Sequence, residues 1–454
     1  MDNRAARYRI ILKLAGQSKQ LDSYEEALLH HNPVLPTFAP RMSAPLRFLA
    51  VLLVLLLIDW YAWRGIHTAI ALRSAPFQRA VRWAYWGVSA AMLAVVLISA
   101  MRLEKLNGPR NFSYLYTIIG VLLMLLLPKL LIIIFHGLED LLELMRWAWG
   151  KMAPGAAGDT DRGRLRFLSQ MGLALATIPF TGVLYGFTRG WRYFNVERIT
   201  IRSPKLPPAF EGLKIVQISD MHLGSFPEHT EVVQHGVDLI NAEDADLVLF
   251  TGDLVNNYAE EAEPWLEQLR GMKAKLGKYA VLGNHDYGDY SQWPDEGAKR
   301  ANVDRLIGHL KDSGFQVLLD EHVALEREGQ RISLIGVQNW GTRFQKYGDL
   351  GKAVAGTSPD DFRLLMSHDP THWDAQVRAT GIDLMLSGHT HGAQFGITIN
   401  GHTYSPAQWV YEEWAGLYEK EGVQLYVNRG FGFIGFPGRV GMPPEITVLA
   451  LHRA

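Results

Sequence analysis

KYAVLGNHD, residues 278–286, is a short apolar run that ends in a cluster of polar residues. A run of about four to six apolar residues bounded by turn residues is typical of a buried strand in a parallel sheet. The same pattern recurs in LKIVQISD (213–220), DLVLFTGD (246–253), FRLLMSHD (362–369) and DLMLSGHTH (383–391). Helical patterns lie between these runs, at 230–241, 260–276 and 301–312. The sequence therefore predicts an α/β core.

The polar residues that follow these strands are of the types that bind metal ions. Because the carboxyl ends of parallel strands meet at one edge of a sheet, we expect these side chains to converge there. Each motif alone has an ordinary structural alternative, such as a capping Asp, a Gly-Asn turn or a hydrogen-bonded buried histidine. All five occur in order and each closes a strand, which favours one shared site. The candidates are Asp220, His222, Asp253, Asn284, His285, His368, His389 and His391.

Taken in order, D-x-H, G-D, G-N-H-D, a lone His and G-H-x-H resemble the signature of the calcineurin-like metallophosphoesterases. The tail YVNRGFGFIGFPGRVGMPPEITVLAL (426–451) is similar to the membrane-anchored bacterial branch. That branch includes secreted phosphodiesterases and UDP-2,3-diacylglucosamine pyrophosphatases. Ala393 departs from the pattern, because many members have Gly there. The resemblance covers about residues 195–454 and implies a four-layer αββα sandwich.

The resemblance also implies a role for each candidate. Asp220, His222 and His391 would hold one metal ion, and Asn284, His368 and His389 a second. Asp253 would bridge the two ions. His285 would bind no metal, but would contact the phosphate and protonate the leaving group.

Elementary chemistry supports a site of this composition. Two cations about 3.5–4 Å apart neutralise a phosphoester and activate a water to hydroxide for attack. Mixed Asp, Asn and His ligands suit Mn²⁺ best, with Fe or Zn²⁺ as alternatives, and do not suit Ca²⁺. The chain has no cysteine, which excludes thiolate metal sites, disulfides and a cysteine nucleophile. Asp286 could orient His285, although adjacent side chains on an extended segment point apart.

The first part of the chain differs in composition from the second. Residues 1–195 contain 22 Lys and Arg against 11 Asp and Glu, whereas residues 196–454 contain 23 against 35. The near-zero net charge of −1 is thus an average over two different parts. After a polar segment, residues 1–45, four apolar stretches are long enough to cross a bilayer core of about 30 Å. We expect spans at 46–66, 83–101, 112–135 and 167–187, a bundle over 46–195, and a phosphoesterase domain over 196–454.

Two charged residues interrupt the apolar stretches. Asp59 and Lys129 either pair inside the bundle or lie near a membrane edge. Aromatic residues gather at the ends of the stretches, as in the belts of membrane proteins, for example Trp60, Tyr61 and Trp63. The alternative is a water-soluble helical bundle.

The orientation in the membrane is weakly specified. Lys and Arg near the ends of the spans number nine on either side, so the positive-inside rule does not decide. DRGRLRFLSQMGLALA (161–176) resembles a basic export signal, which favours a catalytic domain outside the cytoplasm. We therefore expect an integral protein of a bacterial cytoplasmic membrane.

The sequence thus predicts a membrane-bound dinuclear phosphohydrolase that cleaves a phosphoester or pyrophosphate bond. The membrane bundle favours a lipid-linked or membrane-proximal substrate. The alternatives are a general phosphodiesterase on soluble substrates, a non-catalytic metal-binding sensor or scaffold, and a transporter. We expect neither nucleic-acid binding nor an obligate protein partner. Weaker candidates are Asn256, Asn257 and Tyr258 on a loop facing the site, Arg439 for a phosphate, and Trp340, Phe395, Phe431, Phe433 and Phe436 for an apolar rim.

Overall fold

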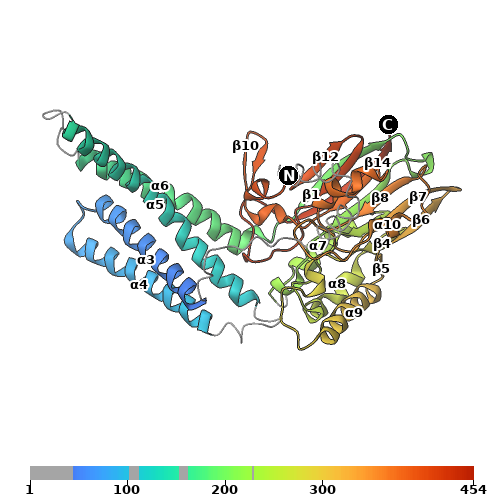
Figure 1. Ribbon diagram of the computed structural model, residues 1–454, viewed down its shortest axis with the longest axis horizontal. Coiled ribbons are helices and arrows are strands. Elements are labelled where there is room, and N and C mark those ends of the chain that lie inside the picture. Colours follow the sequence, from blue (N-terminus) through green and yellow to red (C-terminus); the bar gives the residue numbers. More distant parts are fainter. Residues whose placement is uncertain (1–43, 102–111, 153–161, 228–229) are drawn as a thin grey trace, which may run out of the picture. The chain divides into compact units, whose positions relative to one another are not determined.

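Four helices in the described part of the chain are long and apolar enough to cross a membrane (Figure 1). The computed structural model describes residues 44–101, 112–152, 162–227 and 230–454. The expected polar segment, residues 1–45, therefore lies almost entirely outside the described residues. The four helices are α3 (Ala44–Ala69), α4 (Ala75–Met101), α5 (Phe112–Met152) and α6 (Arg162–Tyr185).

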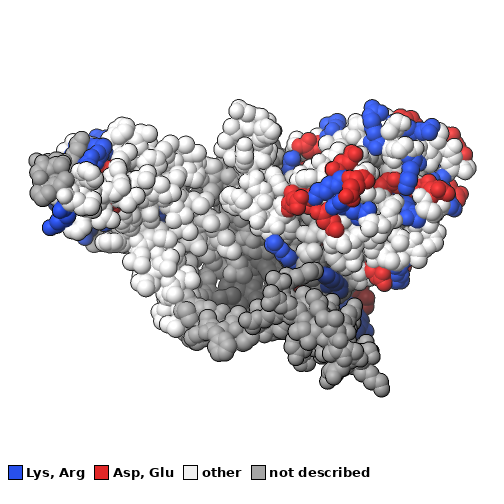
Figure 2. Space-filling view, turned by 45° about the horizontal axis from the view of Figure 1, so that its top comes forward, with Lys and Arg blue, Asp and Glu red and all other residues white. Residues whose placement is uncertain are grey.

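The apolar side chains of these helices face outward. At most 22% of the most apolar window of each helix is buried inside the protein. Figure 2 shows the corresponding surface largely without charged residues. A soluble bundle hides its apolar face from water, whereas a membrane bundle turns it toward lipid. The alternative of a water-soluble bundle is therefore wrong.

An ion pair lies inside the bundle. Lys129 of α5 bonds Asp59 of α3, and the same Nζ lies 3.2 Å from the Oγ of Ser89 on α4. Tyr85 of α4 donates to the backbone oxygen of Asp59 at 2.8 Å. An unpaired charge within a membrane costs about 2.5–3.5 kcal/mol, so mutual pairing offsets the cost of both groups. The sequence left open whether Asp59 and Lys129 pair inside the bundle or lie near a membrane edge. The structure shows the internal pair.

Helix α5 continues to Met152, well beyond its apolar run. Its second half carries two acidic groups that bind other helices. Glu139 is fully buried and accepts from Arg164 of α6 at 2.9 Å. Asp140 accepts from the Tyr61 hydroxyl of α3 at 2.8 Å. Through these polar contacts, α5 stays packed against α3 and α6 beyond residue 135, where the span expected from hydropathy ends.

Two six-stranded sheets form the rest of the described chain. The five strands predicted from the apolar runs are β2, β3 and β4 in one sheet and β8 and β9 in the other. In order, the first sheet contains β1 (Asn195–Ser203), β14 (Glu445–Arg453), β2 (Leu213–Ile218), β3 (Leu247–Phe250), β4 (Gly277–Ala280) and β5 (Phe315–Val317). The second contains β12 (Gly416–Lys420), β13 (Val423–Val427), β9 (Leu384–Ser387), β8 (Phe362–Met366), β7 (Gln330–Gly336) and β6 (Glu321–Arg327).

The two sheets pack face to face, with helices on both outer faces. Alternate strand residues such as Ile215, Leu249 and Leu364 form the core between the sheets. Their neighbours, such as Val216 and Phe250, pack outward against helices. Helices α7 (Val232–Ala242), α8 (Leu266–Gly271) and α9 (Glu296–Asp312) cover the first sheet, and α10 (Leu350–Val354) and α11 (Thr371–Ala375) cover the second. This is the expected four-layer αββα arrangement, in which central strands such as β3 and β8 are buried on both faces.

Parallel pairing brings the ends of the central strands to one edge of each sheet. Strands β2 to β5 are parallel to one another, as are β13, β9, β8 and β7. The last strand, β14, pairs antiparallel with β2 and parallel with β1. The chain terminus is thereby built into the sheet that carries three of the five motifs.

The internal ion pair makes a prediction about stability. Replacing Lys129 by Met leaves Asp59 without its cation, and breaking a buried pair costs about 3–5 kcal/mol. We expect Lys129→Met and Asp59→Leu each to lower the thermal unfolding temperature of the full chain in detergent. The double variant has no unpaired charge and should recover most of the loss. A double variant as unstable as the single variants would contradict a pairing role.

Candidate metal centre

Five strand ends from both sheets deliver the predicted ligands to one place. Asp220 and His222 follow β2, Asp253 follows β3, and Asn284 follows β4. From the second sheet, His368 follows β8, and His389 and His391 follow β9. The backbone N–H of His389 donates to the Asp220 carboxylate at 2.9 Å and so links the two sheets directly.

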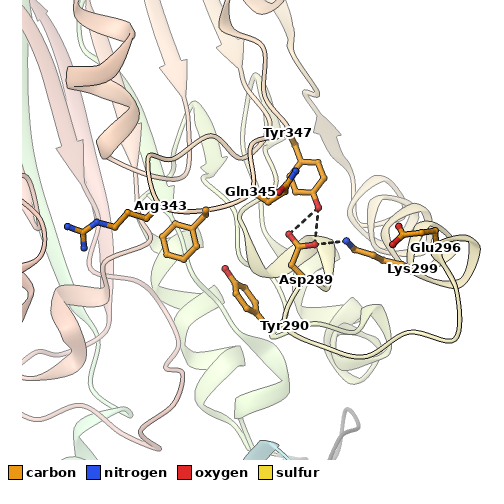
Figure 3. A pocket seen from close by; sticks show the side chains of 8 residues that line it. Asp289, Tyr290, Glu296, Lys299, Arg343, Gln345 and Tyr347 are labelled. Atoms are coloured by element: carbon orange, nitrogen blue, oxygen red, sulfur yellow. Dashed lines mark hydrogen bonds and ion pairs between the residues drawn. The ribbon is translucent and has the colours of Figure 1, made fainter. Parts of the chain in front are cut away.

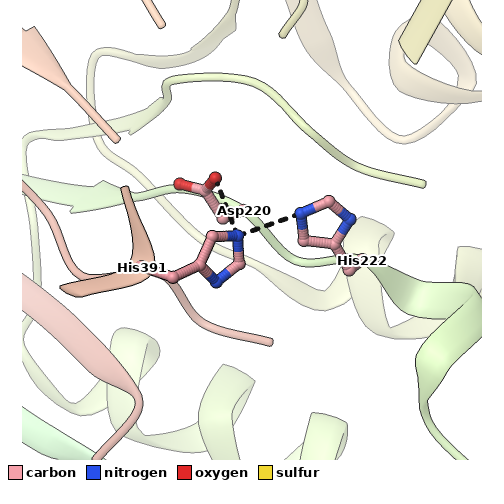
Figure 4. Close-up of side chains that lie close together, drawn as sticks. All are labelled: Asp220, His222 and His391. Atoms are coloured by element: carbon pink, nitrogen blue, oxygen red, sulfur yellow. Dashed lines mark hydrogen bonds and ion pairs between the residues drawn. The ribbon is translucent and has the colours of Figure 1, made fainter. Parts of the chain in front are cut away.

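One group of ligands consists of Asp220, His222 and His391 (Figure 4). The Nε2 of His391 lies 3.2 Å from Asp220 Oδ1 and 3.1 Å from His222 Nε2. All three side chains are buried. Their nitrogen and oxygen atoms therefore point at a common centre, as the ligands of one cation do.

A second group consists of Asp253, His368 and His389. The Nε2 of His368 lies 3.1 Å from Asp253 Oδ2 and 3.3 Å from His389 Nδ1. The same Asp253 oxygen is 3.6 Å from His222 Nε2 in the first group. Asp253 thus lies between the two groups, where the sequence analysis placed a bridging carboxylate.

Asn284 supplies an independent test of whether the site fits metal. Its amide nitrogen donates to the Tyr290 hydroxyl at 2.8 Å, which fixes the orientation of the amide. Its Oδ1 is buried and has no hydrogen-bond partner among the described residues. An unpaired buried carbonyl oxygen is costly, and a cation at this position would satisfy it. The donor set therefore fits the divalent metals that the sequence predicted.

The backbone is strained where the ligands stand. Five of them have positive φ angles, between 44° and 72°: Asp220, His222, Asp253, His389 and His391. This conformation costs about 1–3 kcal/mol for a residue with a side chain and is concentrated at functional sites. Tight, strained turns after short strands place the ligands of consecutive strands within reach of each other.

Two positions in the motifs require glycine, because neighbouring loops approach each other closely there. A Cβ on Gly388 would lie 2.2 Å from Asp220 Oδ2, and one on Gly283 would lie 2.2 Å from Asp253 Oδ1. Both contacts are shorter than any van der Waals separation. The glycines that precede His389 and Asn284 therefore let the ligand loops pack against the carboxylates of the neighbouring loops.

The buried charges act strongly on one another. Burial alone would lower the pKa of His368. The attraction of the Asp253 carboxylate has the larger effect and raises this pKa to about 10. Burial likewise raises the pKa of Asp253, yet His368 and His285 outweigh it and hold that pKa well below its usual range. Without a metal ion, His368 would therefore carry a proton and pair with the ionised Asp253 carboxylate. A divalent cation can take the place of that proton.

Two family models match the chain. Residues 46–191 match "Probable Calcineurin-like phosphoesterase, transmembrane domain", and residues 213–393 match the calcineurin-like phosphoesterase model. An uncharacterised metallophosphoesterase of Bacillus subtilis is 32% identical over 297 residues, which cover 63% of this chain and 97% of that protein. The chain belongs to the calcineurin-like metallophosphoesterases.

Other relatives match most of the length of this chain. A bovine transmembrane protein with metallophosphoesterase domain is 29% identical over 420 residues, 88% of either chain. An uncharacterised metallophosphoesterase of Helicobacter pylori is 26% identical over 410 residues, 89% of this chain and 97% of its own. A solved phosphopantetheinyl hydrolase of Mycobacterium tuberculosis aligns at 12% identity with a TM-score of 0.31, over 48% of this chain and 88% of its own. The expected fold and enzyme class, a membrane bundle followed by a metal-dependent phosphoesterase, are confirmed.

His285 lies beside the ligands and, like His389, is partly exposed. Its Nδ1 lies 2.8 Å from the carbonyl oxygen of Asn256, and its backbone N–H donates to Asp253 at 2.9 Å. The ring of Tyr290 lies 4.5 Å from the imidazole, centre to centre. Asn256, a weak loop candidate from the sequence, therefore contacts the site through its backbone.

Asp286 has a different role from the one considered from the sequence. Its carboxylate accepts from the backbone N–H groups of Gly283, Asp253 and Leu254, at 2.8–2.9 Å. It therefore fastens two ligand loops together and does not orient the His285 ring. A carboxylate with three backbone donors was not predictable, because the loops that it joins are distant in sequence.

Arg439 was wrongly expected to be free for a phosphate. It is 1% exposed, and its guanidinium donates to the backbone oxygens of Gly432, Arg429 and Gly430. The expected apolar rim is also wrong in the main. Phe431, Phe433, Phe436 and Trp340 are buried, and the first two belong to the core under the first sheet. Ordinary core packing, the alternative for the aromatic residues, is what the structure has. For Arg439 the alternative of a surface ion pair is also wrong, because the side chain is buried.

A cavity of about 610 Å³ opens beside the ligands (Figure 3). Tyr290, which contacts Asn284 and His285, forms part of its wall. On another wall, the ring of Phe344 lies 4.7 Å from that of His389. An ion pair between Lys299 and Asp289 closes a further side. The sequence analysis missed these lining residues, because they follow no motif.

The structure offers a matched pair of histidines for testing the ligand assignment. His368 and His372 are both fully buried, but His372 bonds Ser367 and Gln376 away from the ligand groups. We expect His368→Ala to lower the metal content of the purified full chain, measured by mass spectrometry of the elements. His372→Ala should retain the metal, although it should unfold at a lower temperature. Equal metal contents in the two variants would refute the assignment of His368.

Proposed function

We propose that the phosphoesterase binds two divalent cations and hydrolyses a phosphoester or pyrophosphate bond of a lipid-linked or membrane-proximal substrate. The position of Asp253 is the observation that supports binding of two cations rather than one. One of its carboxylate oxygens is within 3.6 Å of a histidine from each ligand group. A single carboxylate shared in this way sets the spacing between two ions.

The ligand roles follow from the two groups. Asp220, His222 and His391 would hold one cation, and His368 and His389 of the second group the other. Asn284, which the family resemblance adds to the second set, has the unpaired oxygen that such a ligand requires. When bound, the two cations supply the positive charge that neutralises the phosphoryl oxygens and activates the attacking water, with Mn²⁺ first and Fe or Zn²⁺ as alternatives. His389 offers Nδ1 to the site, because its Nε2 lies 3.0 Å from the Tyr411 hydroxyl.

His285 is suited to acid catalysis by its hydrogen bond. A carbonyl oxygen can only accept, so the Nδ1 that faces Asn256 carries its hydrogen. The other nitrogen, Nε2, is then the one that contacts the phosphoryl group and, when protonated, donates to the leaving oxygen. An alkoxide is a poor leaving group near neutral pH, so this proton transfer contributes about 10²–10⁴-fold.

The membrane bundle supports a substrate in or near the bilayer. Strand β1 begins at Asn195, a few residues after the last helical turn at Gly190, so the catalytic domain follows the bundle without a long linker. The cavity beside the ligands is large enough for a head group attached to the phosphate. We place the protein in a bacterial cytoplasmic membrane with its catalytic domain at the outer surface. The basic residues in the first turns of α6, Arg162, Arg164 and Arg166, support this orientation, because they resemble the start of an export signal.

Two other functions are weighed against this one. A general phosphodiesterase on soluble substrates would use the same site without the bilayer. A non-catalytic sensor would be expected to have lost a ligand or the acid, whereas all seven ligand positions and His285 are filled here.

The acid role of His285 predicts a dependence on the leaving group. With an alkyl phosphoester, His285→Ala should lower kcat by about 10²–10⁴-fold, while the metal content stays unchanged. With a p-nitrophenyl ester the loss should be much smaller, because that leaving group departs without a proton. His235→Ala, on the exposed face of α7, serves as the control. An equal loss on both esters would contradict acid catalysis.

The lipid-linked substrate is tested with the full chain in nanodiscs. We expect kcat/KM for a phospholipid or nucleotide-linked lipid to exceed that for the water-soluble head-group analogue with the same scissile bond. Equal values would favour the soluble phosphodiesterase. Turnover of neither substrate by the metal-loaded protein would favour the sensor.

A further inference from the structure

A small hairpin close to the metal centre presents an apolar face to the surroundings. Strands β10 (Ile397–Ile399) and β11 (His402–Tyr404) pair antiparallel, with Ile397 opposite Tyr404. Because alternate residues of a strand share a face, Ile397, Ile399 and Tyr404 lie on the same side, together with His402, which is paired with Ile399. The side chains of Ile397, Ile399 and Tyr404 are 59%, 50% and 49% exposed. Thr398 and Thr403, bonded to each other, form the opposite side.

The exposed apolar surface extends beyond the hairpin. Trp409 is 80% exposed and Val410 46%. The segment from Phe395 to Tyr411 contains no Lys, Arg, Asp or Glu. Figure 2 shows the projecting hairpin without charged groups, whereas Lys, Arg, Asp and Glu are spread over much of the catalytic domain on the same face. Exposed apolar surface of this kind marks an interaction surface.

The hairpin is not supported by either large sheet. It forms a separate two-stranded sheet among the described strands, and an isolated hairpin is marginally stable in water. Its base is fixed, because Gly396 N–H donates to the Val440 oxygen at 2.8 Å and Phe395 forms a bridge to Val440. The hairpin is therefore held at its root and uncovered along its apolar face.

The segment that pairs with the root of the hairpin, Arg439 and Val440, also contacts the end of the last span. Arg439 N–H donates to the Gly186 oxygen at 3.2 Å, directly after α6. A Cβ on Gly186 would lie 2.5 Å from Val440, so this glycine allows the close contact. On α6, Leu184 and Tyr185 are exposed in the manner of lipid-facing side chains. The segment that carries the hairpin thus lies against the membrane end of a helix.

From these observations we infer that the β10–β11 hairpin and Trp409 form a docking element for the bilayer that the protein's own helices span. A lipid surface suits this face because the face is mainly apolar and has no Lys, Arg, Asp or Glu. Its polar residues, His402 and the turn residues Asn400 and Gly401, lie at the tip of the hairpin, where they can remain among head groups. Trp and Tyr are the residues that prefer the membrane interface. The inference concerns how the catalytic domain contacts the membrane, and it holds whether or not the substrate is a lipid.

Docking would have a consequence for the metal centre. Trp409 is two residues before Tyr411, whose hydroxyl lies 3.0 Å from His389 Nε2. On the other side of Tyr411, the Arg343 guanidinium lies 5.9 Å from its ring and lines the cavity. Insertion of Trp409 would therefore bring the cavity to the level of the head groups.

The absence of cysteine makes a direct test possible. Single variants Ile399→Cys and Trp409→Cys of the full chain would be labelled with an environment-sensitive fluorophore and placed in nanodiscs that hold one copy. Glu328→Cys, in the turn between β6 and β7, is the control. We expect labels at 399 and 409, about 5–10 Å into the interface, to be quenched severalfold more by doxyl lipids than the label at 328.

A second variant separates insertion from proximity. Adding Ile397→Glu to the labelled Trp409→Cys chain should reduce quenching by lipid, because a carboxylate opposes insertion of the hairpin. Lipid quenching no greater at 399 and 409 than at 328 would overturn the inference. Labels shielded from a water-soluble quencher but not quenched by lipid would also overturn it, since they would indicate a protein partner. None of these readouts depends on catalysis, so a failure of the proposed function would be seen separately.

Discussion

The contact between the Asp253 carboxylate and the His368 imidazole is the interaction on which the site depends. The two side chains come from different sheets and meet 3.1 Å apart with almost no exposure to water. An isolated buried carboxylate is strongly disfavoured, so positive charge must be present nearby. Histidines of both ligand groups surround Asp253, and the unpaired oxygen of Asn284 lies in the same cluster of strand ends. The packing of one sheet on the other thus brings together a cluster of ligands whose negative charge and unpaired oxygen favour cations.

The rest of the domain holds these strained loops in place. Asp286 accepts three backbone N–H groups from the loops after β3 and β4. Glu261 does the same for the loop after Asp253, accepting from the backbone of Asn256, Asn257 and Tyr258. Neither carboxylate reaches the ligand groups. They satisfy backbone donors that tight turns leave unpaired, and so offset part of the strain at the positive φ angles.

The sequence predicted the parts of the site that depend on local pattern. An apolar run followed by Gly, Asp, Asn or His marks a buried strand and its end, so five strands and eight site residues could be named. What it missed depends on contacts between distant segments. Tyr290 and Phe344 line the cavity only because separate loops meet there. Neither sequence-based alternative for Arg439, a phosphate site or a surface ion pair, was right, because its burial is set by tertiary packing and nothing in the local sequence indicates it. The roles of the individual ligands stay predictions.

The central claim is that Asp253 is shared by two metal ions. Anomalous diffraction from crystals of the full chain loaded with Mn²⁺ tests it directly. The account predicts two peaks about 3.5–4 Å apart, both within bonding distance of the Asp253 carboxylate. One peak would lie beside His222 and His391, and the other beside His368 and Asn284. A single peak, or a second peak remote from Asp253, would contradict it.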